Sequence, residues 1–186
     1  MNNTVKICGV ISRGPSFSHL IAGRVFYRGE IVCRRLSGAT DLLPFVCTEA
    51  QAEGIACGDR VCIEGAVKTR DVKSANGCSL DVFLSVLNVA LVDFVSDLNE
   101  VILDGVVCSV CRLREVGARK LRTIMVANSC GYRTSYIPCV LWANDADLPL
   151  AVGDCVSIVG RLQSRDYIKN DGCCGSTREL SVVHIN

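Results

Sequence analysis

Apolar and polar residues alternate in short runs along most of this chain, and turn residues separate the runs. Alternation with a period of two is typical of strands that bury one face. The predicted strands cover residues 5–11, 24–36, 43–47, 60–70 and 80–92 in the first half, and 101–107, 121–127, 136–142, 155–167 and 180–185 in the second. Residues 24–36 form either one bent strand or two short ones. Only two short segments permit a helix, 49–53 and 145–150, and Pro149 interrupts the second.

The second half of the chain repeats landmarks of the first. Residues 61–71 resemble residues 156–166, and a Gly-Asp pair precedes each segment, beginning at Gly58 and at Gly153. Repeated landmarks in the same order indicate tandem copies of one domain. We therefore predict two domains, residues 1–95 and residues 96–186.

Each copy contains about five strands, with one short helical segment before the fourth. This order predicts an all-β protein made of two tandem five-stranded OB-fold Greek-key barrels. A β-sandwich is the alternative, because strand pattern alone does not determine how strands pair. Gly65 and Gly160 interrupt the fourth strand of each copy, where a glycine permits the sharp bend of a small barrel.

Composition constrains location and partners. Hydrophobic residues make up 49% of the chain, which is enough for packed cores. There are 20 Lys and Arg against 19 Asp and Glu, so any site for a polyanion must be local. No apolar run is long enough to cross a membrane, and the N-terminus lacks a signal-peptide pattern. With 13 cysteines and no secretion signal, we expect free thiols and a soluble cytoplasmic protein.

Metal binding and catalysis find little support in the sequence. Cys108 and Cys111 have zinc-ligand spacing, but no second pair completes a four-ligand site. Residues three apart in a strand also point to opposite faces. No phosphate-binding glycine loop occurs, and no nucleophile stands beside a histidine and an acid. We expect no catalytic residue, no metal and no cofactor, and therefore a protein that is not an enzyme.

Basic and aromatic residues interleave in the second copy. Cations that follow phosphates and rings that stack on bases are the mixture that binds single-stranded nucleic acid. Tyr136 and Trp142 are six positions apart in one predicted strand and so share a face. Trp142 alone also suits a core position, because it ends an apolar run. The candidate nucleic-acid contacts are Arg119, Arg122, Tyr132, Tyr136, Trp142, Arg161, Arg165, Tyr167 and Lys169.

Three segments of the second copy carry a resemblance to a known family: Asn99-Glu-Val-Ile-Leu-Asp-Gly105, Tyr136-Ile-Pro-Cys-Val-Leu-Trp142 and Gly160-Arg-Leu-Gln-Ser-Arg-Asp-Tyr167. In these segments the chain resembles the bacterial single-stranded DNA-binding proteins, closest to members with two OB folds in one chain. The resemblance implies a fold that wraps single-stranded DNA over aromatic rings. It makes Tyr136, Trp142 and Tyr167 the stacking residues, with Tyr132 as a looser match.

The resemblance extends more weakly over the first copy, where the stacking platform is missing. Asp41, Cys47 and Val72 occupy the corresponding positions by sequence offset. Two interpretations stay open at this point. Either Phe26, Tyr27 and Phe45 substitute for the missing rings, or the first copy is mainly structural.

The resemblance also implies a role in DNA replication, recombination or repair, close to the nucleoid, with replication or repair proteins as partners. Family members usually assemble four OB folds, so we expect a homodimer of this two-domain chain. They commonly carry an acidic tail tip, and because the sequence ends at Asn186 without one, we do not expect recruitment by that route. The alternatives are a primosomal-type OB-fold module for protein interaction, with incidental nucleic-acid contact, and binding of RNA.

Overall fold

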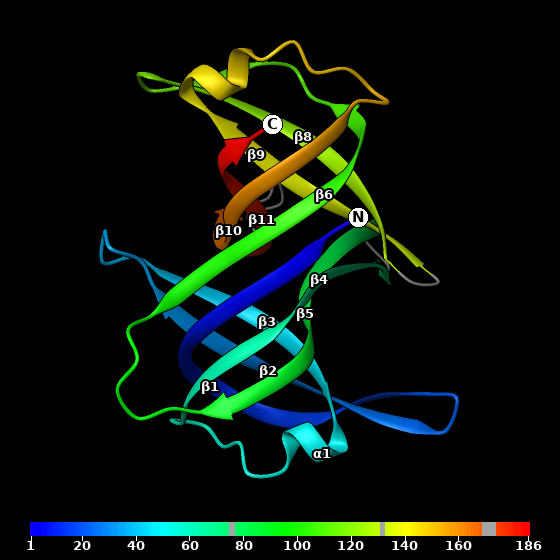
Figure 1. Ribbon diagram of the computed structural model, residues 1–186, viewed down its shortest axis with the longest axis vertical. Coiled ribbons are helices and arrows are strands. Elements are labelled where there is room, and N and C mark those ends of the chain that lie inside the picture. Colours follow the sequence, from blue (N-terminus) through cyan, green and yellow to red (C-terminus); the bar gives the residue numbers. More distant parts are fainter. Residues whose placement is uncertain (75–76, 131–132, 169–173) are drawn as a thin grey trace.

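The computed structural model describes residues 1–74, 77–130, 133–168 and 174–186 and contains two β-barrels, one above the other in Figure 1. The first barrel is built from β1 (Asn3–Ile21), β2 (Arg24–Arg34), β3 (Thr40–Thr48), β4 (Arg60–Ser74) and β5 (Gly77–Leu91), with α1 (Glu49–Ala52) after β3. The second is built from β6 (Leu98–Val110), β7 (Arg114–Val116), β8 (Arg119–Cys130), β9 (Arg133–Trp142), β10 (Cys155–Ile168) and β11 (Cys174–Ile185), with the 3-10 helix η1 (Ala143–Asp147) after β9.

Strand pairing closes each half into a barrel of its own. In the first half the order β1-β2-β3-β5-β4 returns to β1, and in the second half β6-β8-β9-β11-β10 returns to β6. The β3–β5 and β9–β11 pairs are parallel, and the other pairs in the two rings are antiparallel. This is the five-stranded Greek-key barrel of the OB fold. The predicted fold class is confirmed, and the β-sandwich alternative is wrong.

The first strand of the chain is longer than its sequence pattern predicted. β1 continues to Ile21 and forms with β2 a hairpin that projects from the lower barrel in Figure 1. The pairing register shifts three times between Ile11 and His19, which breaks the period of two and hides the strand from the pattern. The hairpin turns at Ala22 and Gly23, which both have positive φ, as a two-residue hairpin turn requires.

Inward-facing side chains from successive strands fill the barrels. The largest fully buried ones are Ile7, Ile11, Ile31, Leu43, Phe45, Ile63 and Leu84 in the first barrel and Leu103, Ile124, Ile137, Leu141 and Ile158 in the second. Gly65 and Gly160 lie beside a register shift in β4–β5 and in β10–β11. A Cβ would come within 2.1 Å of the Ser85 carbonyl oxygen at Gly65, and within 2.5 Å of the Ser181 carbonyl oxygen at Gly160. The barrel geometry therefore requires glycine at both bends, as predicted.

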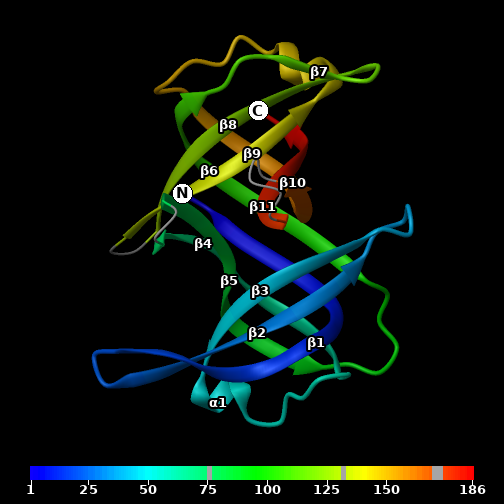
Figure 2. The ribbon, with the colours of Figure 1, turned by 180° about the vertical axis from the view of Figure 1, so that it is seen from behind.

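The two barrels join through β1 and β6, which lie side by side in Figures 1 and 2. The strands pair antiparallel from Asn3 opposite Leu103 to Cys8 opposite Leu98. The buried Asn3 amide donates to the Val67 carbonyl oxygen at 2.9 Å and to Oδ1 of Asn128, in the second barrel, at 3.0 Å. The expected boundary at residues 95 and 96 falls in the segment between β5 and β6.

Two cysteines depart from the expectation of free thiols. Cys8 and Cys62 face each other in the β1–β4 ladder with their Cα atoms 4.1 Å apart, and a disulfide joins them. The sequence pattern does not specify which strands pair or in which register, so it could not reveal this contact. The free cysteines include Cys33, Cys47, Cys57, Cys78, Cys108, Cys111, Cys139, Cys155 and Cys174. Burial raises the pKa of the Cys33 and Cys47 thiols to about 11, so these two side chains pack as neutral groups.

Candidate nucleic-acid interface

The outer face of the second barrel carries the predicted rings of β9. Ile137, Cys139 and Leu141 are fully buried and point into the barrel, so Tyr136 and Trp142 point outward. Tyr136 is 50% exposed. Trp142 is half-buried, and its indole Nε1 donates to the Ser181 hydroxyl at 3.3 Å. The expected common face is confirmed, and Trp142 lies outside the barrel core.

Tyr167 reaches the same outer face from β10. Tyr167 is 41% exposed, and its ring lies over Gly175, its partner across the β10–β11 ladder. A Cβ at Gly175 would come within 2.6 Å of the Tyr167 ring. Glycine at position 175 therefore makes room for the ring to lie flat across the neighbouring strand. Nothing in the sequence pattern marks Gly175 as a supporting residue, because its role depends on the cross-strand register.

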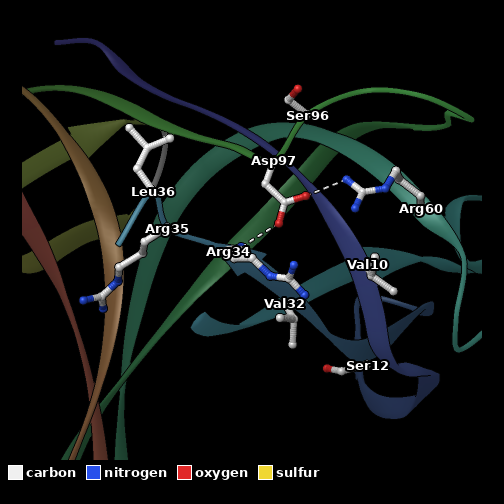
Figure 3. A pocket seen from close by; sticks show the side chains of 9 residues that line it. All are labelled: Val10, Ser12, Val32, Arg34, Arg35, Leu36, Arg60, Ser96 and Asp97. Atoms are coloured by element: carbon white, nitrogen blue, oxygen red, sulfur yellow. Dashed lines mark hydrogen bonds and ion pairs between the residues drawn. The ribbon is translucent and has the colours of Figure 1, made fainter. Parts of the chain in front are cut away.

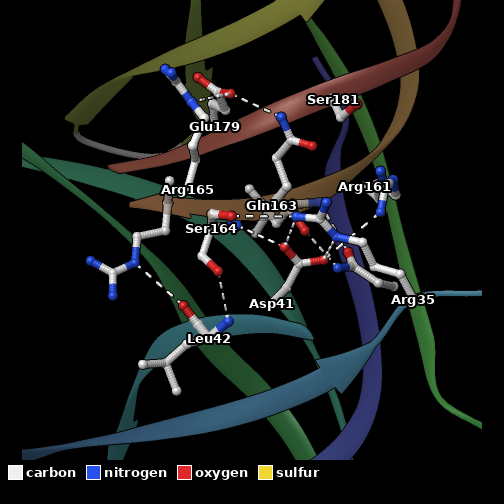
Figure 4. Close-up of polar contacts among 12 residues, drawn as sticks. Arg35, Asp41, Leu42, Arg161, Gln163, Ser164, Arg165, Glu179 and Ser181 are labelled. Carbon is white, nitrogen blue, oxygen red and sulfur yellow. Dashed lines mark hydrogen bonds and ion pairs between the residues drawn. The ribbon is translucent and has the colours of Figure 1, made fainter. Parts of the chain in front are cut away.

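Figure 4 shows the cations of β10 beside carboxylates. Arg161 Nη1 lies 3.9 Å from Asp41 Oδ2, and Arg165 Nε lies 3.5 Å from Glu179 Oε1. The Arg165 side chain is 62% exposed and that of Arg161 34% exposed, so both retain access to solvent. Gln163 Nε2 also donates to Glu179 Oε1, at 2.8 Å. These carboxylates lower the local positive charge that a phosphate would meet.

Asp41 is a buried anchor between the barrels. Arg35 binds its carboxylate through Nε, at 2.8 Å, and through Nη2, and this hydrogen bonding raises the pKa of the Arg35 guanidinium. The Ser164 backbone N–H donates to Asp41 Oδ1 at 2.8 Å, and the Leu42 N–H donates to the Ser164 hydroxyl at 2.9 Å (Figure 4). Because Asp41 belongs to β3 and Ser164 to β10, the carboxylate links the two domains.

Arg122 and Arg119 of β8 differ from the cations of β10 in their surroundings. Arg122 is half-buried, and its Nη1 donates to the Leu148 carbonyl oxygen at 2.9 Å. Its Nε is buried and has no hydrogen-bond partner among the described residues. Arg119 is exposed where β8 begins. Tyr132 and Lys169 lie outside the described residues.

A second group of arginines, which the sequence analysis missed, surrounds a hollow of about 620 Å³ in the first barrel (Figure 3). Asp97 accepts from Arg60 Nη1 at 2.6 Å and from the Arg34 backbone N–H at 2.6 Å. Burial of Asp97 by itself would raise the pKa of its carboxyl, but these hydrogen bonds and the nearby arginines lower it below its usual value. The carboxylate therefore fastens the segment between the barrels to β2 and β4.

The ladders correct the correspondence between the two copies. β3 pairs with β5 at Phe45 and Leu84, and β9 pairs with β11 at Cys139 and Leu180. Counting back along each third strand from Phe45 and Cys139 places Leu42, not Asp41, at the position of Tyr136. Counting forward places Thr48, not Cys47, at the position of Trp142. The first barrel therefore has no ring at either position.

The proposed substitutes in the first copy have different surroundings. Phe45 is 1% exposed and belongs to the barrel core. Tyr27 packs against that core, and its hydroxyl donates to Glu49 at 3.3 Å. Phe26 is half-buried and stacks on His19.

No protein-family model matches this chain, and no curated protein matches it in sequence. Among solved structures it is similar to wild-type single-stranded DNA binding protein from Thermus aquaticus, with 18% identity and a TM-score of 0.74, over 100% of this chain and 92% of that chain. A deletion mutant of that protein gives 17% identity and a TM-score of 0.75, over 100% and 93%. The N-terminal domain of PriB from Thermoanaerobacter tencongensis gives 27% identity and a TM-score of 0.43, over 50% of this chain and 100% of that chain.

Proposed function

We propose that this protein is a non-catalytic single-stranded DNA-binding protein that acts in replication, recombination or repair. The observation that carries the proposal is the outer face of the second barrel, where the exposed Tyr136 and Tyr167 and the half-buried Trp142 lie on the same barrel surface as Arg161 and Arg165. The similarity of fold to single-stranded DNA binding protein from Thermus aquaticus, over the whole chain, supports it. Bases stack on the rings while the guanidinium groups neutralise phosphates, so binding has little sequence preference.

Fluorescence anisotropy of labelled oligo-dT, measured at several salt concentrations, tests this proposal. Tyr136→Ala, Trp142→Ala and Tyr167→Ala should each weaken binding by about 1–3 kcal/mol, the contribution of one stacked base. Arg161→Gln and Arg165→Gln should each flatten the log–log salt slope by about 0.7 for every phosphate that is no longer neutralised. Tyr27→Phe is the matched aromatic control, because Tyr27 packs against the first core. Unchanged affinity in all three alanine variants would contradict the stacking assignment.

The pairing of Arg161 with Asp41 and of Arg165 with Glu179 favours a second candidate function. In this alternative the protein is a primosomal-type OB-fold module that binds a replication or repair protein, and nucleic acid is an incidental ligand. It predicts that oligo-dT binds weakly and leaves Trp142 fluorescence unchanged. Strong quenching of Trp142 on addition of oligo-dT would favour the DNA-binding function instead.

We also propose that the chain forms a homodimer with four OB folds. The outer face of β5, β4, β1 and β6 holds a hollow of about 260 Å³ whose lining includes Leu87, 81% exposed, and Ile102. Burial of exposed apolar side chains favours association of symmetric copies. Light scattering should give twice the 20.0 kDa chain mass, and Leu87→Lys should shift the protein toward the monomer. A wild-type monomer at micromolar concentration would contradict this assembly.

A further inference from the structure

The first barrel has an outward-facing ring, Phe26, at the same level along the barrel as Trp142 in the second. Phe26 lies on the second strand of its barrel, whereas Trp142 lies on the third. In the second barrel Trp142 of β9 pairs with Leu121 of β8. In the first barrel the equivalent pair is Thr48 of β3 with Phe26 of β2. Directly paired residues lie on the same face of a sheet, so Phe26 faces outward as Trp142 does. The aromatic position has moved by one strand, which a comparison of third strands alone cannot detect.

Phe26 forms a flat stack with a second ring. His19 of β1 pairs with Phe26 across the projecting hairpin, and the ring centroids are 5.2 Å apart at an interplanar angle of 10°. Both side chains are half-buried, and therefore half-accessible. A preformed stack of this kind offers a flat surface for an unpaired base.

Arginines surround a third ring next to this stack. Arg28 and Arg70 have their Cζ atoms 5.8 Å and 5.7 Å from the centroid of the Phe83 ring. Both bind the one carboxylate of Asp81, with Arg28 donating at 2.7 and 2.8 Å and Arg70 at 2.9 Å. Two guanidinium groups share one carboxylate, so this group keeps an excess positive charge. The pKa of His19 is lowered by burial and then by Arg70 and Arg28, which places the stack in the electric field of both arginines.

One hollow connects this group to the second barrel. A hollow of about 490 Å³ has two arginines and one carboxylate in its lining, which includes Tyr136 and Arg133 of the second barrel and Thr69, Arg70 and Asp71 of the first. The Tyr136 backbone N–H donates to the Thr69 hydroxyl at 2.9 Å, so the two barrels are in direct contact there. Arg70 therefore lines the hollow beside Tyr136 and also lies over Phe83.

We propose that a single nucleic-acid strand bound at Tyr136 crosses this hollow along Arg133 and Arg70 and places its next bases on a first-barrel platform formed by His19, Phe26, Arg28 and Phe83. Accessible rings beside excess positive charge suit unpaired bases and phosphates better than an uncharged peptide. This inference rests on the proposed single-stranded DNA-binding function, and it gives the first barrel a share of the contacts that its third strand lacks.

Binding to oligo-dT of two lengths tests the proposal. About 10 nucleotides fit one OB fold, and about 35 are enough for two. We compare the double variant His19→Ala/Phe26→Leu with the single variant Arg70→Gln. Each should weaken binding of the long oligonucleotide by about 5- to 150-fold for each base that no longer stacks. Binding of the short oligonucleotide to the second barrel should not change. The Arg70 side chain is 42% exposed, so we expect the Arg70→Gln variant to fold. This variant therefore tests the proposal even if the double variant unfolds. Arg13→Gln is the matched control, because Arg13 is an exposed hairpin cation paired with Glu30.

The outcomes separate this inference from the function on which it rests. Equal affinity of wild type and both platform variants for the long oligonucleotide would overturn the crossing path and leave the second-barrel function intact. Equal losses on both lengths would overturn it as well, because the platform would then not be specific to the longer strand. A wild-type protein that binds neither length would instead refute the proposed function itself.

Discussion

The two barrels have interiors of the same kind and contact each other through equivalent residues, but their outer faces differ. Both bend their fourth strand at a glycine, and both use a hydroxyl of that strand to bind the other barrel, with Thr69 accepting from Tyr136 N–H and Ser164 from Leu42 N–H. On the outer face, by contrast, Tyr136 and Trp142 in the second barrel correspond to Leu42 and Thr48 in the first. Close packing constrains the interior, whereas the outer surface can change its chemistry while the fold stays the same.

The projecting hairpins differ in the same way. In the first barrel the hairpin exposes Phe17, Leu20 and Ile21. In the second barrel the equivalent region exposes Arg112, Arg114 and Arg119. The first hairpin therefore adds large exposed apolar groups to its exposed Arg13, whereas arginines predominate on the second, so we expect the two hairpins to make different contacts.

The joint between the barrels differs at one pair of equivalent positions, where the first barrel has the buried carboxylate of Asp41. The ladders place Ser135 of the second barrel at the position of Asp41, and both residues are buried. Asp41→Asn should reduce the free energy of unfolding by about 3 kcal/mol, because Arg35 loses its charged partner and the asparagine NH2 group cannot accept the hydrogen bond from Arg35 Nε. Urea denaturation measures the change.

Lys120→Gln is the control for the loss of an ion pair, because Lys120 and Asp147 are both about half exposed. Its cost should stay within about 0–1 kcal/mol. A cost for Asp41→Asn as small as that of the control would mean that the joint is held by strand pairing alone. The buried Asp41 of the first barrel would then contribute no more to the free energy of unfolding than an exposed ion pair.

A smaller effect should appear at the outer face of the first barrel in acid. Burial by itself would raise the pKa of Asp81, but the hydrogen bonds and charges of Arg28 and Arg70 outweigh it and lower the pKa. A carboxyl whose folded-state pKa is depressed stabilises the protein above its unfolded pKa, about 3.9, and loses that contribution as the pH falls through the folded value. The wild-type free energy of unfolding should therefore fall steadily below about pH 5.

Asp81→Asn should cost about 1–2 kcal/mol at pH 7, because two arginines lose a charged acceptor, and it should flatten the acid decline. The difference between variant and wild type is the readout, because the pKa values of Asp97 and Asp104 are lowered too and add to the decline in both proteins. Parallel curves down to about pH 3 would show that the Arg28–Asp81–Arg70 group is not coupled to folding.

Local pattern was sufficient for several features of this protein. The period of two identified ten barrel strands, and the repeated landmarks identified two copies of one barrel. The same period placed Tyr136 and Trp142 on one face, because alternation along a strand does not depend on its neighbours. The bends at Gly65 and Gly160 were also visible, since a glycine within an apolar strand is itself a local signal.

Register and long-range pairing were decided only in the tertiary structure. The Cys8–Cys62 disulfide, the burial of Asp41 between the barrels and the stack of His19 on Phe26 all join residues that no periodicity connects. Side-chain neighbours across a sheet depend on which strands pair and in which register, and a shift of one residue exchanges the two faces. Local pattern therefore indicated two tandem β copies and a common face for Tyr136 and Trp142, while tertiary packing closed the barrels, joined them and set which rings face outward on the first.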